Sequence, residues 1–284
     1  MKILTILEGA VAEAVQGVRE THASLLADGE FDCFPVESLY FNIYPSTLDV
    51  GVLSGGHPLP AENYKYVAYW HNTKPNHLSL LAEYCFQKGI VMLNRDLARQ
   101  SRELISNKVM QSKFFQANDI PFLPVSNTYQ KNNMVMKPSR GSCGQGVSLL
   151  PQGRLLPDNL YHDTTRNGLM LQEFLKYDSD YRVIVVGGKS IGVIERVPLE
   201  NDFRANISLG AKAQVPTIDT GAITELAEHT ASKLSCDYVG VDILRCGTKL
   251  YVLEVNFFAN FSGFESIHGV GCVLNSIKAH MGRS

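Results

Sequence analysis

The stretch Leu250-Tyr-Val-Leu-Glu-Val-Asn256 has the apolar composition of a buried β-strand, yet it carries an acid and an amide near its end. Residues two apart in a strand share a face, so Glu254 and Asn256 point the same way. Just upstream, Val239-Gly-Val-Asp-Ile-Leu244 is a second apolar strand that is interrupted by one acid, Asp242. A function must explain why two neighbouring strands each carry an acid where Val or Leu would pack better.

The connection between these two strands contains Gly247-Thr248, which fits a tight hairpin turn. If Cys246 pairs with Leu250, the loop holds three residues and the two acids lie directly opposite each other. A loop of two residues would shift the pairing by one and move the acids to opposite faces. We predict the first arrangement, in which Asp242 and Glu254 are cross-strand neighbours.

Two carboxylates that face each other across a strand pair destabilise it, and burying them without compensation costs far more. A bound divalent cation removes this cost, and hard oxygen ligands suit Mg²⁺ completed by phosphate oxygens and water. The alternative is that each acid pairs with a nearby Arg or Lys or lies exposed, which is the better interpretation of any single acid in a strand. Three oxygen ligands in register favour the metal site, so we predict Asp242, Glu254 and Asn256 as its ligands.

A magnesium ion with so few protein ligands implies a phosphate ligand, and Lys137 is a candidate phosphate binder. It lies in the strand Met134-Val-Met-Lys-Pro138, directly before the glycine-rich stretch GSCGQG at 141–146. That stretch has neither the dinucleotide nor the P-loop spacing. We interpret it as a hairpin tip whose backbone N–H groups bind phosphates. A plain turn is an equally good interpretation of the tip, and a surface lysine is the alternative for Lys137.

Further candidates lie downstream. In Leu171-Gln-Glu-Phe-Leu175 the backbone can bond to an adenine edge while the apolar side chains contact the ring. The segment Asn201-Asp-Phe-Arg-Ala-Asn206 contains Arg204, whose planar fork suits a phosphate under transfer. A solvated Arg204 is the alternative.

Composition excludes several classes of protein. The 284 residues are 45 % hydrophobic and 19 % charged, as in an ordinary globular enzyme. The formal net charge of −2 gives no electrostatic case for nucleic acid or an anionic membrane as a partner. We find no signal-peptide core and no membrane-spanning run. The six cysteines include no Cys-x-x-Cys pair, so we expect reduced thiols and a cytoplasmic protein.

Strand and helix patterns alternate up to about residue 95, which predicts a small open parallel sheet. A helix is expected at about 104–117, and short strands joined by turns follow from residue 134. Two more helices are expected at about 219–234 and 264–280. The change of rhythm predicts three domains, at residues 1–95, 96–175 and 176–284.

The order of these motifs resembles the ATP-grasp ligases, and specifically the RimK-like carboxylate–amine ligases. The resemblance covers the chain from about residue 95 to its end, and Asp202-Phe-Arg-Ala-Asn206 and Glu254-Val-Asn256 are its most specific parts. It implies an α+β ATP-grasp fold: a small open parallel β/α domain followed by two α+β subdomains that clasp ATP.

The resemblance also implies roles for individual residues. Arg204 and Lys137 would be catalytic, and Glu254 would bridge two Mg²⁺ ions, for which Mn²⁺ can substitute. Residues 173–175 would form the adenine-binding linker. The nucleotide contacts implied are Lys108, Lys137, Gly141, Ser142, Gly144, Gly146, Gln172, Glu173, Phe174, Leu175, Asp180, Arg182, Arg204 and Asn206.

The implied reaction joins a carboxylate to an amine through an acyl phosphate and releases ADP and phosphate. Small-molecule or peptide carboxylates and amines would be the partners, and a homo-oligomer is compatible with the sequence. The alternative class is a nucleotide-binding regulatory or assembly module without ligase activity. One departure concerns the acceptor: the family often has Ser-Ser-Pro-Gly after Glu-Val-Asn, whereas this chain has Phe257-Phe-Ala-Asn260. The two phenylalanines either pack in the core or contact substrate.

Overall fold

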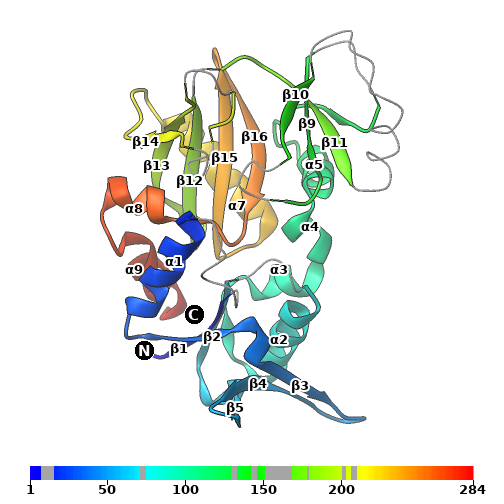
Figure 1. The fold of residues 1–284 in the computed structure, drawn as a ribbon, viewed down its shortest axis with the longest axis vertical. Coiled ribbons are helices and arrows are strands. Elements are labelled where there is room, and N and C mark those ends of the chain that lie inside the picture. The colour runs from blue at the N-terminus through cyan, green and yellow to red at the C-terminus, as the bar shows by residue number, and fades with distance from the viewer. Residues whose placement is uncertain are drawn as a thin grey trace.

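The computed structural model describes residues 1–7, 16–70, 75–128, 133–141, 146–150, 168–177, 179–199, 203–205 and 210–283. Two antiparallel sheets lie side by side in the upper half of Figure 1, and a parallel sheet that contains the N-terminal strand lies below them. Within the described part of the chain, no helix is both long and apolar enough to cross a membrane.

The predicted parallel sheet at the N-terminus is confirmed. Its four strands have the order β2-β1-β6-β7 and are all parallel. The two central strands, β1 and β6, are fully buried, as expected of a parallel sheet. The elements are β1 (Ile3–Leu7), α1 (Gln16–Ala27), β2 (Phe31–Pro35), β6 (Tyr66–Trp70), α2 (Pro75–Lys88) and β7 (Val91–Met92).

A small antiparallel sheet, which the sequence patterns did not indicate, is inserted between β2 and β6. Two short 3₁₀ helices flank it, and its strand order is β3-β4-β5. The inserted elements are η1 (Val36–Ser38), β3 (Leu39–Ile43), β4 (Leu48–Ser54), β5 (His57–Pro60) and η2 (Ala61–Asn63).

Three short helices lead from the parallel sheet to the rest of the chain. They are α3 (Arg95–Gln100), α4 (Arg102–Ser106) and α5 (Lys108–Ala117). The single helix predicted at 104–117 is therefore wrong in one respect, because the chain breaks at Asn107. The Asn107 side chain accepts from the N–H groups of Val109 and Met110, so it caps α5. This cap places Lys108 in the first turn of α5.

The second sheet is antiparallel and has the order β10-β9-β11-β8. Its strands are β8 (Val125–Ser126), β9 (Met134–Pro138), β10 (Ser148–Leu150) and β11 (Leu169–Glu173). Lys137 in β9 pairs with Met170 in β11, so Lys137 lies next to the strand that leads into the predicted adenine-binding linker.

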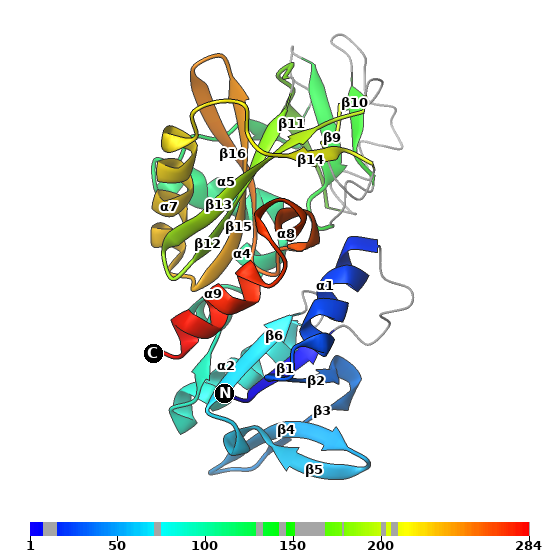
Figure 2. The ribbon, with the colours of Figure 1, turned by 90° about the vertical axis from the view of Figure 1, so that its left-hand side faces the viewer.

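The third sheet is antiparallel and has the order β14-β13-β12-β15-β16. Helix α7 covers one face, and α8 and α9 cover the other (Figure 2). The alternation along β12 explains this, because Val183 and Val185 pack towards α7 while Ile184 and Val186 pack towards α8 and α9. The elements are β12 (Asp180–Val186), β13 (Lys189–Val197), β14 (Lys212–Gln214), α7 (Gly221–Leu234), β15 (Tyr238–Cys246), β16 (Lys249–Asn256), α8 (Ser262–His268) and α9 (Cys272–Met281).

Residues from both ends of the chain share one hydrophobic core. Trp70 of the parallel sheet packs against Tyr238 and Phe261, with ring centroids 5.0 and 5.8 Å apart. The parallel sheet and its inserted antiparallel sheet lie within residues 1–95, the second sheet lies within residues 96–175, and the third sheet lies within residues 176–284. We keep these boundaries as a proposal, since the first and last segments do not have separate cores.

A buried asparagine fastens the two halves of this core together. The Asn94 side chain donates to the carbonyl groups of Tyr238 and Phe257, at 2.8 and 3.3 Å. It also accepts from the N–H groups of Asp237 and Tyr238, at 2.8 and 2.9 Å. Its backbone is left-handed, with φ of 58°, which an asparagine tolerates better than most residues.

We expect Asn94→Ala to lower the free energy of unfolding by about 3 kcal/mol, because it leaves buried backbone groups unpaired and strains a left-handed position. Urea denaturation of the variant against the parent protein measures this. The exposed Asn42→Ala is the matched control and should cost less than about 0.5 kcal/mol. Equal effects of the two substitutions would contradict the role given to Asn94.

Candidate active site

The hairpin of β15 and β16 brings the two predicted acids together, but not by the route expected from the sequence. Cys246 pairs with Lys249, so the turn Gly247-Thr248 has two residues and the three-residue loop is wrong. A β-bulge at Asp242 then adds one residue to β16, and Asp242 pairs with Glu254. The predicted cross-strand contact of the two acids is therefore confirmed.

The bulge leaves one extra residue in β16 next to the acids. Val252 pairs with Ile243 and Glu254 pairs with Asp242, so Leu253 is the extra residue. Bulges of this kind are common beside active sites because they redirect side chains. Leu253 and Glu254 both line one pocket.

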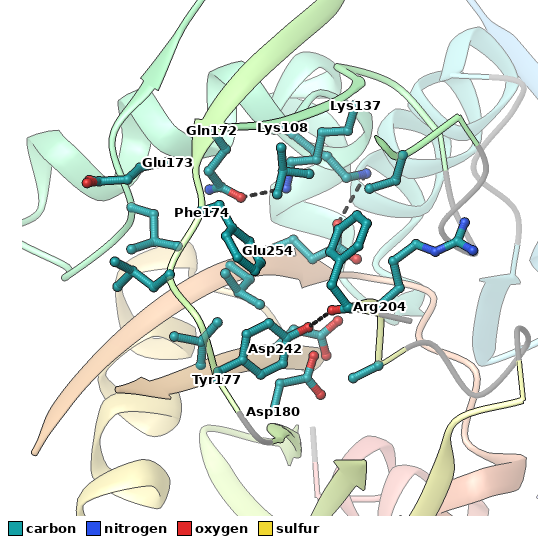
Figure 3. A pocket seen from close by; sticks show the side chains of 18 of the residues that line it. Lys108, Lys137, Gln172, Glu173, Phe174, Tyr177, Asp180, Arg204, Asp242 and Glu254 are labelled. Carbon is teal, nitrogen blue, oxygen red and sulfur yellow. Dashed lines mark hydrogen bonds and ion pairs between the residues drawn. The ribbon is translucent and has the colours of Figure 1, made fainter. Parts of the chain in front are cut away.

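This pocket lies between the second and third sheets (Figure 3) and encloses about 860 Å³ of empty space, its open mouth included. Its lining includes the apolar residues Leu123, Val135, Phe174, Leu175 and Leu244 together with charged side chains.

Most of the predicted site residues lie in this pocket. Arg182, Asn256 and Gly146 do not line it, although Arg182 and Asn256 contact the acids that do. Ser142, Gly144 and Asn206 lie outside the described residues, as does Cys143. The predicted residues that line the pocket are Lys108, Lys137, Gly141, Gln172, Glu173, Phe174, Leu175, Asp180, Arg204, Asp242 and Glu254.

Two lysines face the acid of β16. The ammonium group of Lys108 lies 3.2 Å from the Glu254 carboxylate and donates to the Gly141 carbonyl at 2.6 Å. Burial would raise the pKa of Glu254, but the positive charges of Lys108 and Lys137 hold it at about 2. Glu254 is therefore ionised at neutral pH.

Lys137 is a half-buried lysine that lines the pocket from β9. It donates to the side-chain oxygen of Gln172 at 2.8 Å, which fixes its direction. Burial lowers the pKa of Lys137 to about 8, although the negative charge of Glu254 opposes the shift. The surface-lysine alternative is thus wrong for Lys137.

The acid of β15 is held by arginines. Arg182 binds both oxygens of Asp242, at 2.7 and 2.8 Å. Arg196 binds both oxygens of Asp180, at 2.6 and 2.9 Å. Burial raises the pKa of Asp180 to about 6 against the pull of Arg196, so Asp180 is a carboxylate at neutral pH.

Sequence reasoning missed Arg196, which lines the pocket and is only 3 % exposed. An arginine inside the apolar strand β13 was the available signal, but its partner Asp180 becomes apparent only from the pairing of β13 with β12. Tyr177 and Phe203 were also missed as lining residues. The Tyr177 hydroxyl donates to the Phe203 carbonyl at 2.6 Å, and the Phe203 ring packs edge-on against Phe174.

The stretch Phe257-Phe-Ala-Asn260 packs in the core, which decides between the two alternatives for its phenylalanines. Phe257 is 2 % exposed, and the half-buried Phe258 packs against all three large core clusters. Neither lines the pocket. Asn260 accepts from the Thr21 hydroxyl at 2.8 Å and thereby ties this stretch to α1.

The fold belongs to a known class. The phosphomimetic-precursor, Mg and ADP complex of the ATP-grasp ligase PsnB superimposes with a TM-score of 0.67 at 17 % identity, over 99 % of this chain and 98 % of that one. D-alanine–D-alanine ligase from Bacillus anthracis with ATP gives 0.67 at 14 %, over 100 % and 98 %. The predicted ATP-grasp fold is confirmed.

Residues 94–278 match the model of the RimK-like ATP-grasp domain, which is more than half of the chain. The chain therefore belongs to the RimK-like ATP-grasp family. A probable alpha-L-glutamate ligase of Haemophilus ducreyi is 31 % identical over 64 % of this chain and 63 % of its own length. The ribosomal protein bS6–L-glutamate ligase of Escherichia coli is 33 % identical over 52 % of this chain and 51 % of its own. The alignments thus span between half and two thirds of these relatives.

The electrostatics of the pocket give a test that needs no ligand. We expect the side chain of Lys137 to titrate near pH 8, because burial disfavours its charged form. Glu254→Gln should lower the pKa of Lys137 further, because it removes a negative charge that favours the ammonium form. Carbon-13 NMR of labelled lysine side chains measures both values, with Lys137→Arg to assign the signal.

The exposed Lys189 serves as the control for that titration, since its side chain is 80 % exposed. Its signal should not respond to Glu254→Gln. A Lys137 signal that titrates at the free-lysine value of about 10.4 would contradict the desolvation of Lys137 in the pocket.

Proposed function

We propose that this protein is an ATP-dependent ligase that joins a carboxylate to an amine and releases ADP and phosphate. The observation that carries the proposal is the pairing of Asp242 with Glu254 at a pocket wall, opposite the ammonium groups of Lys108 and Lys137. A triphosphate with its metal ion needs carboxylates that bind the metal and cationic groups that bind the phosphates, and this pocket has both. Family membership and the names of the relatives support the same reaction.

The residues fit a magnesium ion. Asp242 and Glu254 supply carboxylate oxygens, and Asn256 lies 3.2 Å from Glu254 and 3.5 Å from Asp242. Its amide presents either nitrogen or oxygen by a half-turn of the last bond. No group of three or more His, Cys, Asp or Glu suited to a metal occurs in the described ranges, so the amide must complete the set.

When bound, Mg²⁺ would neutralise phosphate charge. We assign two ions to the site, with Glu254 as the shared ligand and Mn²⁺ as a substitute. Lys108 and Arg182 now balance the charges of the two acids. Pairing of each acid with a nearby Arg or Lys was the alternative interpretation of the sequence. These pairs explain how the two acids are tolerated without a metal ion.

The apolar side of the pocket fits an adenine ring. The backbone N–H groups of Glu173 and Phe174 donate to Pro124 and Asn133 within the protein. Within this linker the N–H group that would serve the adenine edge is therefore that of Leu175, and the side chains of Leu123 and Phe174 would contact the ring faces. Gln172 accepts from Lys137, which would bind the phosphates.

The protein's own groups position the reactants and balance charge. In the first step the substrate carboxylate attacks the γ-phosphorus, the bond to the β-phosphate oxygen breaks, and ADP leaves. In the second step the amine attacks the carbonyl carbon of the acyl phosphate, phosphate leaves and a proton is lost from nitrogen. Lys137 and Arg204, both lining the pocket, would bind the oxygens of the transferred phosphoryl group.

For substrates we propose amino acids, peptides or small biosynthetic metabolites, with no nucleic acid and no membrane as partners. The solved PsnB structures contain precursor peptides, and one relative is named for a ribosomal protein. The core position of the stretch 257–260 argues against a glutamyl acceptor bound as in relatives with Ser-Ser-Pro-Gly. We propose a cytoplasmic site of action because the described cysteines are all free thiols.

Release of ADP and phosphate from ATP, screened over pairs of amino acids and short peptides, tests the reaction. A pair that raises ADP release together with formation of the amide product, seen by mass spectrometry, would establish ligation. ADP-bound protein without product over the whole screen would favour the alternative, a nucleotide-binding module.

With a productive pair in hand, we expect Glu254→Gln to lower kcat by at least about 100-fold, since it weakens charge stabilisation at the reacting phosphate. Folding should be retained, because the amide keeps the shape of the side chain. Glu228→Gln on α7, a helix on the far face of the sheet, is the control and should leave turnover unchanged. Near-normal turnover of Glu254→Gln at saturating Mg²⁺ would rule out the role given to Glu254.

A further inference from the structure

Four charged side chains form a network beside the pocket, and only one of them, Asp242, has a direct part in the proposed reaction. Asp180, Arg182, Arg196 and Asp242, here called the charged quartet, lie on one face of three adjacent strands. Arg182 pairs with Asp242 across β12 and β15, and Asp180 pairs with Arg196 across β12 and β13. Residues that are directly opposite share a face, so strand register alone places all four together.

The network is closed by a contact between its two halves. Besides its two bonds to Asp180, Arg196 lies 3.3 Å from Oδ2 of Asp242. The side chains of Asp180, Arg196 and Asp242 are 4–6 % exposed, and that of Arg182 is 14 % exposed. Two positive and two negative charges cancel, which is the condition for burying them.

The contacts leave the two oxygens of Asp242 unequal. Oδ2 faces both guanidinium groups, at 2.8 Å from Arg182 and 3.3 Å from Arg196. Oδ1 accepts from Arg182 alone among the described residues. A carboxylate oxygen has room for about two partners, so Oδ1 is the atom that keeps a lone pair free. The planar fork of Arg182 binds both oxygens, and the contact of Arg196 with Oδ2 adds a third point of attachment that opposes turning of the carboxylate.

We propose that Arg196 is a positioning residue that fixes the Asp242 carboxylate so that Oδ1 binds the cation. In the same network Asp180 is the counter-ion of Arg196 and makes no contact with the nucleotide. This rests on the proposed function, because it takes Asp242 as a metal ligand. It departs from the expectation that Asp180 contacts the nucleotide: Asp180 lines the pocket, but both of its oxygens bind Arg196, whose charge it balances.

Two binding measurements test this without turnover. The first is Mn²⁺ affinity in the presence of the non-hydrolysable analogue AMP-PNP, followed by electron paramagnetic resonance. The second is AMP-PNP affinity in EDTA, followed by calorimetry. We expect Arg196→Gln to weaken Mn²⁺ binding by about 10- to 100-fold, as is usual for partners of metal ligands, and to change AMP-PNP affinity in EDTA by less than about twofold.

A second variant tests whether weaker Mn²⁺ binding is caused by loss of folding. Arg196→Gln leaves Asp180 buried without a partner, whereas the double variant Arg196→Gln/Asp180→Asn removes one charge of each sign and should unfold near the parent temperature. It should still bind Mn²⁺ weakly. Arg196→Lys, which keeps the charge but lacks the fork, should lie between the parent and Arg196→Gln.

Glu195→Gln is the matched control. Glu195 is the neighbouring buried residue on the other face of β13, where it accepts from Ser179 at 2.6 Å. The substitution should cost stability but leave Mn²⁺ affinity unchanged. An effect on Mn²⁺ as large as that of Arg196→Gln would mean that any buried charge matters, and the positioning role would be wrong.

The outcomes separate this inference from the proposed function. Parent-like Mn²⁺ affinity in the folded double variant would overturn the positioning role and leave the ligase proposal standing. Asp180→Asn that weakens AMP-PNP binding in EDTA more than about fivefold would show that Asp180 contacts the nucleotide. Parent protein that binds neither Mn²⁺ nor AMP-PNP would overturn the proposed function itself.

Discussion

The rest of the pocket depends on one constraint, the burial of two carboxylates opposite each other in the β15–β16 hairpin. Like charges in that position repel, and a low-dielectric surrounding makes the repulsion stronger. The protein meets the cost with basic side chains from different parts of the chain. Lys108 comes from α5 and contacts Glu254, while Arg182 comes from β12 and contacts Asp242. The acids can therefore lie ready for a cation without unfolding the sheet around them.

The same constraint explains the position of α5 and of the second sheet. Lys108 reaches Glu254 only because Asn107 starts a new helix at that point. Gln111 of α5 strengthens the attachment, since its side chain exchanges hydrogen bonds with the backbone of Val255 next to the acid. Lys137 then closes the pocket from β9. Charge balance and backbone pairing thus hold the two sheets on either side of one cavity.

The stretch after the acids has a structural task that follows from its composition. Phe257 and Phe258 fill the junction between the third sheet and the N-terminal sheet. Asn260 and Asn94 supply hydrogen bonds across the same junction. A large apolar interface of this kind favours a fixed relation between the two regions.

The sequence by itself determined the class of the fold and most of the pocket, because these follow from local patterns. Alternating apolar runs indicated the strands, and Asp242, Glu254 and Lys137 stood out as polar residues where packing would favour apolar ones. Only the tertiary structure decided the turn length, the compensating bulge and the partners of Arg196. A two-residue turn followed by a bulge gives the same facing acids as a three-residue turn, so no local pattern distinguishes them. Arg196 acquires its partners from β12 and β15, and pairing between strands distant in sequence is set by the packing of the whole sheet.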